Sequence, residues 1–163
     1  MIFVTIGAAR GFPRLISKMD EIAGKTDEEV IIQVGYTNYQ PIHAKYLTFI
    51  NREEMLRLIQ ESRIVVTHSG TSITDILKLG RPAVVVPRFK KYHEAINDHQ
   101  VELCQALEKQ GKIIAIYDIE KLEAALNEPR VAEPLVRNDC RLIGALRKYI
   151  DEFEAIAKKK AGV

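Results

Sequence analysis

Cysteine is scarce in this chain, which has only Cys104 and Cys140 among its 163 residues. The two lie too far apart for a zinc signature and both fall in helical patterns, so we expect small buried side chains in a reducing compartment and no disulfide. The sequence also lacks a cluster of histidines or carboxylates with metal-ligand spacing, and it lacks a Gly-x-Ser-x-Gly elbow. We therefore expect no metal, no bound cofactor and no acyl-enzyme chemistry.

Long hydrophobic runs and an excess of basic charge are absent as well. The longest apolar runs, such as residues 83–86, are far shorter than the roughly 18 residues of a membrane span, and residues 1–4 enter a strand pattern at once. We therefore expect no signal peptide and no membrane anchor, which predicts a cytoplasmic location. The 24 Lys and Arg residues are offset by 22 Asp and Glu residues, and without a basic field we expect no nucleic-acid partner.

Strand and helix patterns alternate along a chain whose size and 47% hydrophobic content suit one domain over residues 1–163. This alternation predicts an α/β fold with a mostly parallel sheet. Near the C-terminus, Asp139 can cap a helix over residues 139–160 that either completes the core or packs on a partner. The expected strands are 2–6, 30–34, 46–49, 64–66, 83–86 and 113–116, and the other expected helices are 12–23, 52–62, 73–79, 97–110 and 119–126.

The most informative segment, residues 64–87, joins two buried-strand patterns through a small-residue loop and a helix. The loop 69–72 is rich in hydroxyl groups, and apolar residues then recur at helical spacing over 73–79. The loop after a parallel strand and the N-terminus of the next helix expose N–H groups and a partial positive charge, which favour a diphosphate. Asp75, about one turn into the helix, could accept hydrogen bonds from ribose hydroxyls.

Two further loops follow strands, and ligands of open α/β sheets collect at the C-terminal ends of strands. In residues 7–13, Gly7 either contacts a ligand or only forms the turn, while Arg10 or Arg14 could meet a phosphate. Residues 33–40 are polar and aromatic, and they form either a wall of the pocket or an ordinary surface loop. The sequence leaves both alternatives open.

The segment 87–100 is long for a connection between a strand and a helix, and it gathers many hydrogen-bonding side chains. Long loops of this kind are typically functional. Asn97 and Asp98 are predicted to cap the next helix, whereas His99 and Gln100 in its first turn would point back toward the strand ends, where a sugar could lie.

His68 ends the strand that precedes the small-residue loop. A histidine at this place could be catalytic, but it more often forms a structural hydrogen bond that orders the loop. We favour the structural interpretation.

Five short segments resemble those of a known family. Residues 68–73 and 97–100 resemble the His-Ala-Gly-Thr-Gly-Ser/Thr loop and the Asp-Asn-His-Gln segment of glycosyltransferase family 28. Residues 4–7, 12–16 and 32–35 resemble the Val-Thr-Val-Gly, Pro-Phe-x-Arg-Leu and Gln-x-Gly elements of its short members. These members are catalytic subunits of two-subunit N-acetylglucosaminyltransferases of dolichol-linked oligosaccharide synthesis and of bacterial exopolysaccharide transferases. The resemblance spans roughly residues 2–115, and several motifs in the same order are far more specific than one glycine-rich loop.

The resemblance implies a Rossmann-like sheet with helices on both faces, corresponding to the C-terminal, donor-binding half of a GT-B glycosyltransferase. It implies inverting transfer of a hexose, most simply N-acetylglucosamine, from a UDP-sugar to a polyprenyl-linked glycan acceptor at the cytosolic membrane face. The acceptor would be bound by a separate membrane-anchored subunit, and the chain would be inactive alone. The alternatives are a regulatory module that binds a nucleotide sugar without catalysis, and a structural protein of the same fold.

The resemblance also implies roles for individual residues. The turn at 70–72 would hold the diphosphate, Asp75 the ribose, and Gln100, with Asn97 or His99 nearby, the sugar. The catalytic base is unassigned and is expected on the partner subunit, and no metal is required. Ser69, Ser72, Asp75 and the order of Asn97 and Asp98 depart from the family pattern, which leaves the identity of the donor open. The expected donor-binding residues are Gly7, His68, Ser69, Gly70, Thr71, Ser72, Asp75, Asn97, Asp98, His99 and Gln100.

Overall fold

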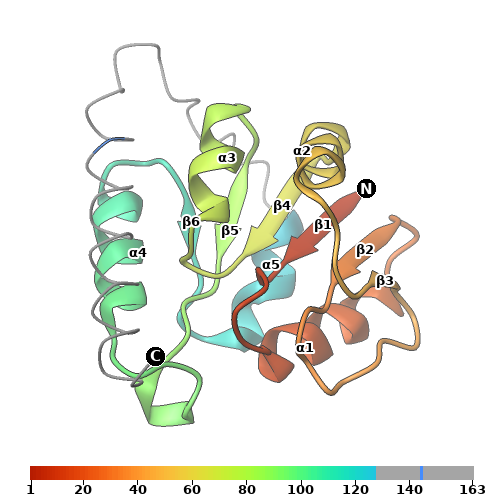
Figure 1. Ribbon diagram of the computed structural model, residues 1–163, viewed down its shortest axis with the longest axis horizontal. Coiled ribbons are helices and arrows are strands. Elements are labelled where there is room, and N and C mark those ends of the chain that lie inside the picture. Colours follow the sequence, from red (N-terminus) through yellow and green to blue (C-terminus); the bar gives the residue numbers. More distant parts are fainter. Residues whose placement is uncertain (128–143, 145–163) are drawn as a thin grey trace.

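The computed structural model describes residues 1–127 and residue 144, and a six-stranded sheet forms the centre of this part of the chain. The strands lie in the order β3-β2-β1-β4-β5-β6, and each neighbouring pair is parallel (Figure 1). The predicted α/β fold with a parallel sheet is confirmed. The strands are β1 (Ile2–Thr5), β2 (Val30–Gln33), β3 (Lys45–Leu47), β4 (Ile64–Thr67), β5 (Ala83–Val85) and β6 (Ile114–Ala115).

Helices cover both faces of the sheet, as expected. Buried residues of α1 and α5 pack on one face, and those of α2, α3 and α4 pack on the other. The predicted helix over 139–160 lies outside the described residues. The helices are α1 (Pro13–Ala23), α2 (Arg52–Glu61), α3 (Ser72–Lys78), α4 (His99–Lys109) and α5 (Leu122–Asn127), with the short 3-10 helices η1 (Lys90–Tyr92) and η2 (Ile119–Lys121).

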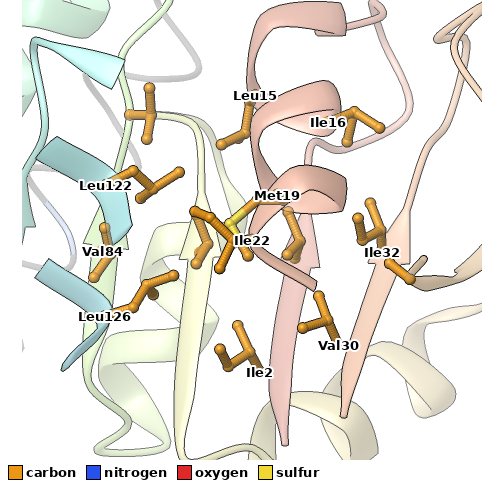
Figure 2. Packing of buried hydrophobic residues seen from close by; sticks show 14 of the residues in the cluster. Ile2, Leu15, Ile16, Met19, Ile22, Val30, Ile32, Val84, Leu122 and Leu126 are labelled. Carbon is orange, nitrogen blue, oxygen red and sulfur yellow. The ribbon is translucent and has the colours of Figure 1, made fainter. Parts of the chain in front are cut away.

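The two cores follow from the alternation of side chains along each strand. Ile2 of β1 belongs to the cluster under α1, whereas its neighbour Phe3 belongs to the cluster on the other face. Figure 2 shows the first cluster, in which Met19 of α1 and Leu122 of α5 approach the strand side chains from the helices that cover them. Because both faces are covered, the central strands β1, β4 and β5 are buried along their whole length and mostly apolar, as parallel strands usually are.

The N-terminal ends of the strands and the loops before them form what we call the amino edge. At this edge, hydrogen bonds to Asp20 of α1 fix the loop before β3 in place. The Asp20 carboxylate accepts hydrogen bonds of 2.8 to 3.0 Å from the backbone N–H groups of Ile42, His43 and Ala44, and one of 2.9 Å from the Tyr39 hydroxyl. Burial acts to raise the pKa of Asp20, but these hydrogen bonds outweigh burial and lower it.

A second group of paired charges lies at the amino edge. Glu28, before β2, accepts hydrogen bonds from the guanidinium of Arg63, before β4, at 2.6 to 3.2 Å. The terminal amine of Met1 donates to Glu28 at 2.8 Å, and Arg63 also donates to the carbonyl of Leu126 at 3.1 Å. The hydrogen bonds from Arg63 are the main cause that lowers the pKa of Glu28 to about 2.

Candidate functional site

The opposite ends of the strands, here called the carboxyl edge, carry the loops 6–12 after β1, 68–71 after β4 and 86–98 after β5. From β1 the chain continues to β2 on one side, and from β4 it continues to β5 on the other. The boundary between β1 and β4 is therefore the point where the strand order reverses. Ligands of open α/β sheets bind outside the carboxyl ends of the strands at such a point.

His68 lies between the two glycine loops at this boundary. A Cβ atom added to Gly70 would lie 2.3 Å from Nε2 of His68, and one added to Gly7 would lie 3.3 Å from Cε1. Gly7 also has a φ of +70°, a conformation that side-chain-bearing residues rarely adopt. The imidazole thus fills the space between the loops after β1 and β4, and both glycines are required by its close approach.

The chemistry of His68 agrees with a packing role. Burial is the main cause that lowers its pKa to about 3, and the nearby Arg88 cation lowers it further. The imidazole is therefore neutral at physiological pH. Among the described residues its buried Nδ1 atom makes no well-formed hydrogen bond, and the Thr5 backbone acts on the ring as a hydrogen-bond partner that opposes the lowering of the pKa. The favoured structural role therefore rests mainly on packing, with a weaker contribution from the expected hydrogen bond.

Several backbone N–H groups in the loops on either side of the boundary have no protein partner among the described residues. Within residues 1–127, the N–H groups of residues 8–11 donate to no protein group, and neither do those of Ser69, Thr71 and Ser72. Exposed N–H groups of this kind suit an anionic ligand. The Ser69 hydroxyl cannot reach such a ligand, because it is buried beside the thiol of Cys104. Burial also raises the pKa of that thiol to about 12. Only the backbone of Ser69 is left to contact a donor.

Asp75 lies in the first turn of α3, as predicted, with its side chain 15% exposed. Its carboxylate accepts two hydrogen bonds from Arg52, the first residue of α2, at 3.1 and 3.2 Å. Arg52 is 69% exposed, so this ion pair is weak and a competing hydroxyl group can displace it. The carboxylate is held in place but remains open to a ligand.

The loop after β5 is braced by its own polar side chains. Oε1 of Gln100 accepts a hydrogen bond from the backbone N–H of Arg88 at 3.1 Å, which fixes the start of the loop. Asp98 is the N-cap residue of α4, as predicted, but its side chain makes no capping hydrogen bond: the carboxylate instead accepts from the N–H of Lys90 at 2.9 Å, at the start of the unpredicted helix η1. Asn97 accepts a long 3.4 Å bond from the N–H of His99.

His99 turns along its own helix. Its Nδ1 atom lies 2.8 Å from a carboxylate oxygen of Glu102, one turn later in α4. The structure therefore places Gln100 at the carboxyl edge beside Arg88, whereas His99 is engaged with its own helix.

Arg14 is occupied by protein groups rather than open to a phosphate. Its guanidinium forms two hydrogen bonds with the Glu94 carboxylate, at 2.7 and 2.8 Å, and a third with the Pro87 carbonyl at 3.0 Å. It also lies 5.5 Å from the ring centre of Phe89 and 5.1 Å from that of Tyr92. Arg14 joins α1 to the loop after β5, so the expectation that it meets a phosphate does not fit this geometry.

Arg88 is the residue that the sequence analysis missed. It follows β5, is 4% exposed, and donates from Nη2 to the carbonyls of Ile6 at 3.3 Å and Arg10 at 2.6 Å. Its guanidinium lies 5.0 Å from the ring centre of Phe12. Burial lowers the pKa of Arg88 to about 10, which leaves it protonated at neutral pH. Its place directly after a buried strand was the only available signal.

With this geometry in place, comparison with known proteins identifies the family. The model of the glycosyltransferase family 28 C-terminal domain matches residues 1–138. This chain belongs to that family. The match includes the loops after β1, β4 and β5, so the whole carboxyl edge lies inside the region that matches the family.

Solved structures agree in fold. The NMR solution structure of ALG13 matches with a TM-score of 0.59 and 20% identity over 87% of this chain and 94% of the ALG13 chain. The crystal structure of MurG from Acinetobacter baumannii matches with a TM-score of 0.55 and 17% identity over 76% of this chain. The matched region spans 39% of the MurG chain. This family 28 domain therefore has the Rossmann-like fold of the C-terminal half of a GT-B glycosyltransferase.

In residues 1–127 and 144, no three His, Cys, Asp or Glu side chains come together as a group that could hold a metal ion. No helix in that part of the chain is both long and apolar enough to cross a bilayer.

Proposed function

We propose that this family 28 domain is the donor-binding catalytic subunit of an inverting glycosyltransferase that takes a hexose, most simply N-acetylglucosamine, from a UDP-sugar. The observation that carries the proposal is the pair of glycine loops at the boundary of β1 and β4. Within residues 1–127, several N–H groups of these loops, those of residues 8–11, Ser69, Thr71 and Ser72, have no protein partner, and a neutral histidine lies between the loops. N–H groups can bind an anion there without any side chain having to gain a proton.

In this proposal each part of the donor has its own group. The N–H groups of Thr71 and Ser72 bind the diphosphate, while the N–H of Gly70 donates to the His68 carbonyl at 2.9 Å. The Asp75 carboxylate leaves Arg52 to accept hydrogen bonds from the ribose. Gln100 contacts the sugar through its amide nitrogen, because Oε1 already accepts from the N–H of Arg88. The nitrogen has no partner among the described residues.

Transfer then depends on stabilising the diphosphate as it leaves the sugar. Backbone N–H groups that are already oriented stabilise the developing charge without reorganisation. The acceptor hydroxyl needs a general base, and a buried histidine with a pKa of about 3 is too weak for this role at neutral pH. We therefore assign the base to the partner subunit.

The partner in this proposal is a separate membrane-anchored subunit that binds a polyprenyl-linked glycan acceptor. The likeness to ALG13, which covers 87% of this chain and 94% of the ALG13 chain, supports a partner. The chain would act in the cytoplasm, at the membrane face where this partner is anchored, and would turn over little donor alone.

Calorimetric titration of the chain with UDP, UDP-N-acetylglucosamine, UDP-glucose, GDP-mannose and ADP-glucose tests the proposal. Uridine nucleotides should bind selectively. Asp75→Asn should weaken all of them by about tenfold or more, because a charged acceptor for the ribose is lost. Asp27→Asn is the matched control, since Asp27 is exposed in the turn before β2 at the amino edge.

A second variant examines the sugar contact. Gln100→Glu keeps an oxygen for the Arg88 N–H and removes the amide donor, so it should abolish the preference among UDP-sugars while leaving UDP itself nearly unchanged. Gln105→Glu makes the same chemical change at an exposed position of α4. Equal affinity for all five ligands would contradict the proposal. Selective binding without transfer, even with the membrane subunit added, would instead indicate a regulatory module.

A further inference from the structure

Arg88 is a buried cation whose charge no carboxylate of the described residues contacts. Its Nη2 atom donates only to backbone carbonyls, and its Nε atom is buried without any partner. Glu94, the acidic residue that acts on it most, is itself bound in two hydrogen bonds to Arg14. Burying an uncompensated charge is costly, so a group that brings negative charge to this place gains an unusually strong interaction.

The hydrogen bonds of Arg88 also orient the loop after β1. Arg88 draws the carbonyls of Ile6 and Arg10 toward the protein interior, at 3.3 and 2.6 Å. The buried side chain of Gln33 does the same for Gly7, whose carbonyl accepts from Nε2 at 3.2 Å. Three carbonyls of one short loop therefore face inward, held by two buried side chains.

The opposite sides of these peptides face away from the interior. Described residues have no cis peptide bond, and in a trans peptide the N–H points opposite to the C=O of the same plane. The N–H groups of Ala8 and Gly11 share planes with the Gly7 and Arg10 carbonyls, so both point away from Gln33 and Arg88. Neither has a protein partner within residues 1–127. Convergent N–H groups in a short loop form an anion-binding concavity.

We propose that Arg88 holds residues 7–11 as a phosphate-binding loop and that its buried charge attracts the diphosphate of the nucleotide bound at the boundary of β1 and β4. The identity of the nucleoside rests on the function proposed above; the phosphate loop itself does not. Arg88 is a positioning residue here, because the groups that touch the phosphate are the N–H groups of the loop. The exposed side chains of Ala8 and Ala9 leave the approach to the loop open.

The test compares a ligand that carries both nucleoside and diphosphate with ligands that carry only one of the two. The chain and its Arg88→Met and Arg88→Lys variants are titrated with UDP, uridine and inorganic pyrophosphate at low ionic strength. Arg88→Met should weaken UDP and pyrophosphate by about tenfold or more and leave uridine unchanged, with Arg88→Lys intermediate. Arg63→Met is the matched control: it removes the same charge and another bond to a backbone carbonyl, but at the amino edge.

A second pair of variants avoids the buried position. Ala9→Glu places a carboxylate on the loop, and Ala9→Gln is its neutral isostere. Ala9→Glu should weaken UDP and pyrophosphate by about tenfold relative to Ala9→Gln, because like charges repel at short range. Since Ala9 is exposed, these two variants should fold, and they test whether the loop binds phosphate even if Arg88→Met does not fold.

The outcomes separate this inference from the proposed function. Pyrophosphate binding that depends on Arg88, together with no uridine selectivity, would support the phosphate loop and contradict the UDP-sugar proposal. Equal UDP affinity in the unaltered chain and in Arg88→Met would overturn the inference, and so would an equal loss of uridine and UDP. Absence of both UDP and pyrophosphate binding would overturn it too.

Discussion

The buried and partly buried carboxylates at the amino edge have hydrogen-bond partners, whereas two buried cationic or imidazole side chains at the carboxyl edge are only partly satisfied. At the amino edge, the Asp20 carboxylate accepts from three backbone N–H groups and a hydroxyl, and Glu28 is paired with Arg63. At the carboxyl edge, His68 and Arg88 each bury a nitrogen atom that makes no well-formed hydrogen bond among the described residues. Both edges belong to the same parallel strands, so the difference lies in the loops.

This contrast separates stability from function. Unpaired buried polar groups cost free energy, and in a native protein each needs an explanation. At the carboxyl edge the explanation we offer is a ligand whose negative charge and oxygen atoms complete the loops. At the amino edge the Asp20 and Glu28 carboxylates already have partners in the chain, so these two groups should act on folding alone. Nε of Arg81, before β5, is the exception at this edge, since among the described residues it is buried without a partner.

The largest effect is expected at Asp20. Asp20→Ala should lower the free energy of unfolding by about 3 kcal/mol, because it removes the acceptor that three backbone N–H groups of the loop before β3 share and leaves the buried N–H of Ala44 without one. Urea denaturation followed by circular dichroism measures this loss. Nucleotide affinity of the folded fraction should not change. A variant as stable as the parent would show that the amino edge does not depend on this carboxylate.

Glu28 should give the amino edge a pH dependence. Its pKa in the folded chain is about 2, below the usual 4.5, so its contribution is complete above pH 4.5 and is lost as pH falls toward 2. Glu28→Gln should therefore be less stable by about 2 kcal/mol at pH 7, allowing for partial exposure, and should approach the parent near pH 2. Denaturation curves at several pH values measure the difference, and a constant gap down to pH 2 would contradict the assignment.

A smaller effect on stability, with a clear effect on binding, is expected at Gly70. In Gly70→Ala the new Cβ would meet Nε2 of His68 at 2.3 Å, which forces the imidazole to move at a cost of about 1–2 kcal/mol. UDP affinity should fall because the two loops separate. His68→Ala in the same chain should restore part of the lost stability, since it removes the clash. If the double variant is less stable than the single one, His68 does not fill this space.

The smallest effect is expected at Ser69. Its buried hydroxyl lies beside the Cys104 thiol, which is at most a weak hydrogen-bond partner, so Ser69→Ala should change the free energy of unfolding by no more than about 0.5 kcal/mol. Affinity for UDP should also hold, because only the backbone of Ser69 is positioned to meet a ligand. A loss of several-fold in affinity would show that the hydroxyl turns toward the donor.

The fold could be predicted from the sequence because it depends on local patterns. The unit from β4 to β5 shows a short apolar strand, helical spacing and terminating residues in series, and all three elements lie where expected. The capping of α4 was only partly predicted because the Asp98 carboxylate reaches back to Lys90 rather than to its own helix. No local propensity distinguishes these two hydrogen bonds.

The candidate site was only partly predictable for the same reason. Gly7, His68 and Gly70 were chosen from their positions after strands, and the structure brings them into contact. Arg88 acts on carbonyls 78 and 82 residues earlier in the chain, and its role depends on the order of strands in the sheet. Contacts of this range have no signature in a single sequence.

One measurement tests the contrast between the edges most directly: amide chemical shifts of the isotopically labelled chain, followed as UDP-N-acetylglucosamine is added. The account predicts that saturable changes concentrate at residues 7–11, 69–72 and 88, while residues 24–29, 42–44 and 62–63 at the amino edge stay unchanged. Changes centred on the amino edge, or no saturable change at the carboxyl edge, would contradict it.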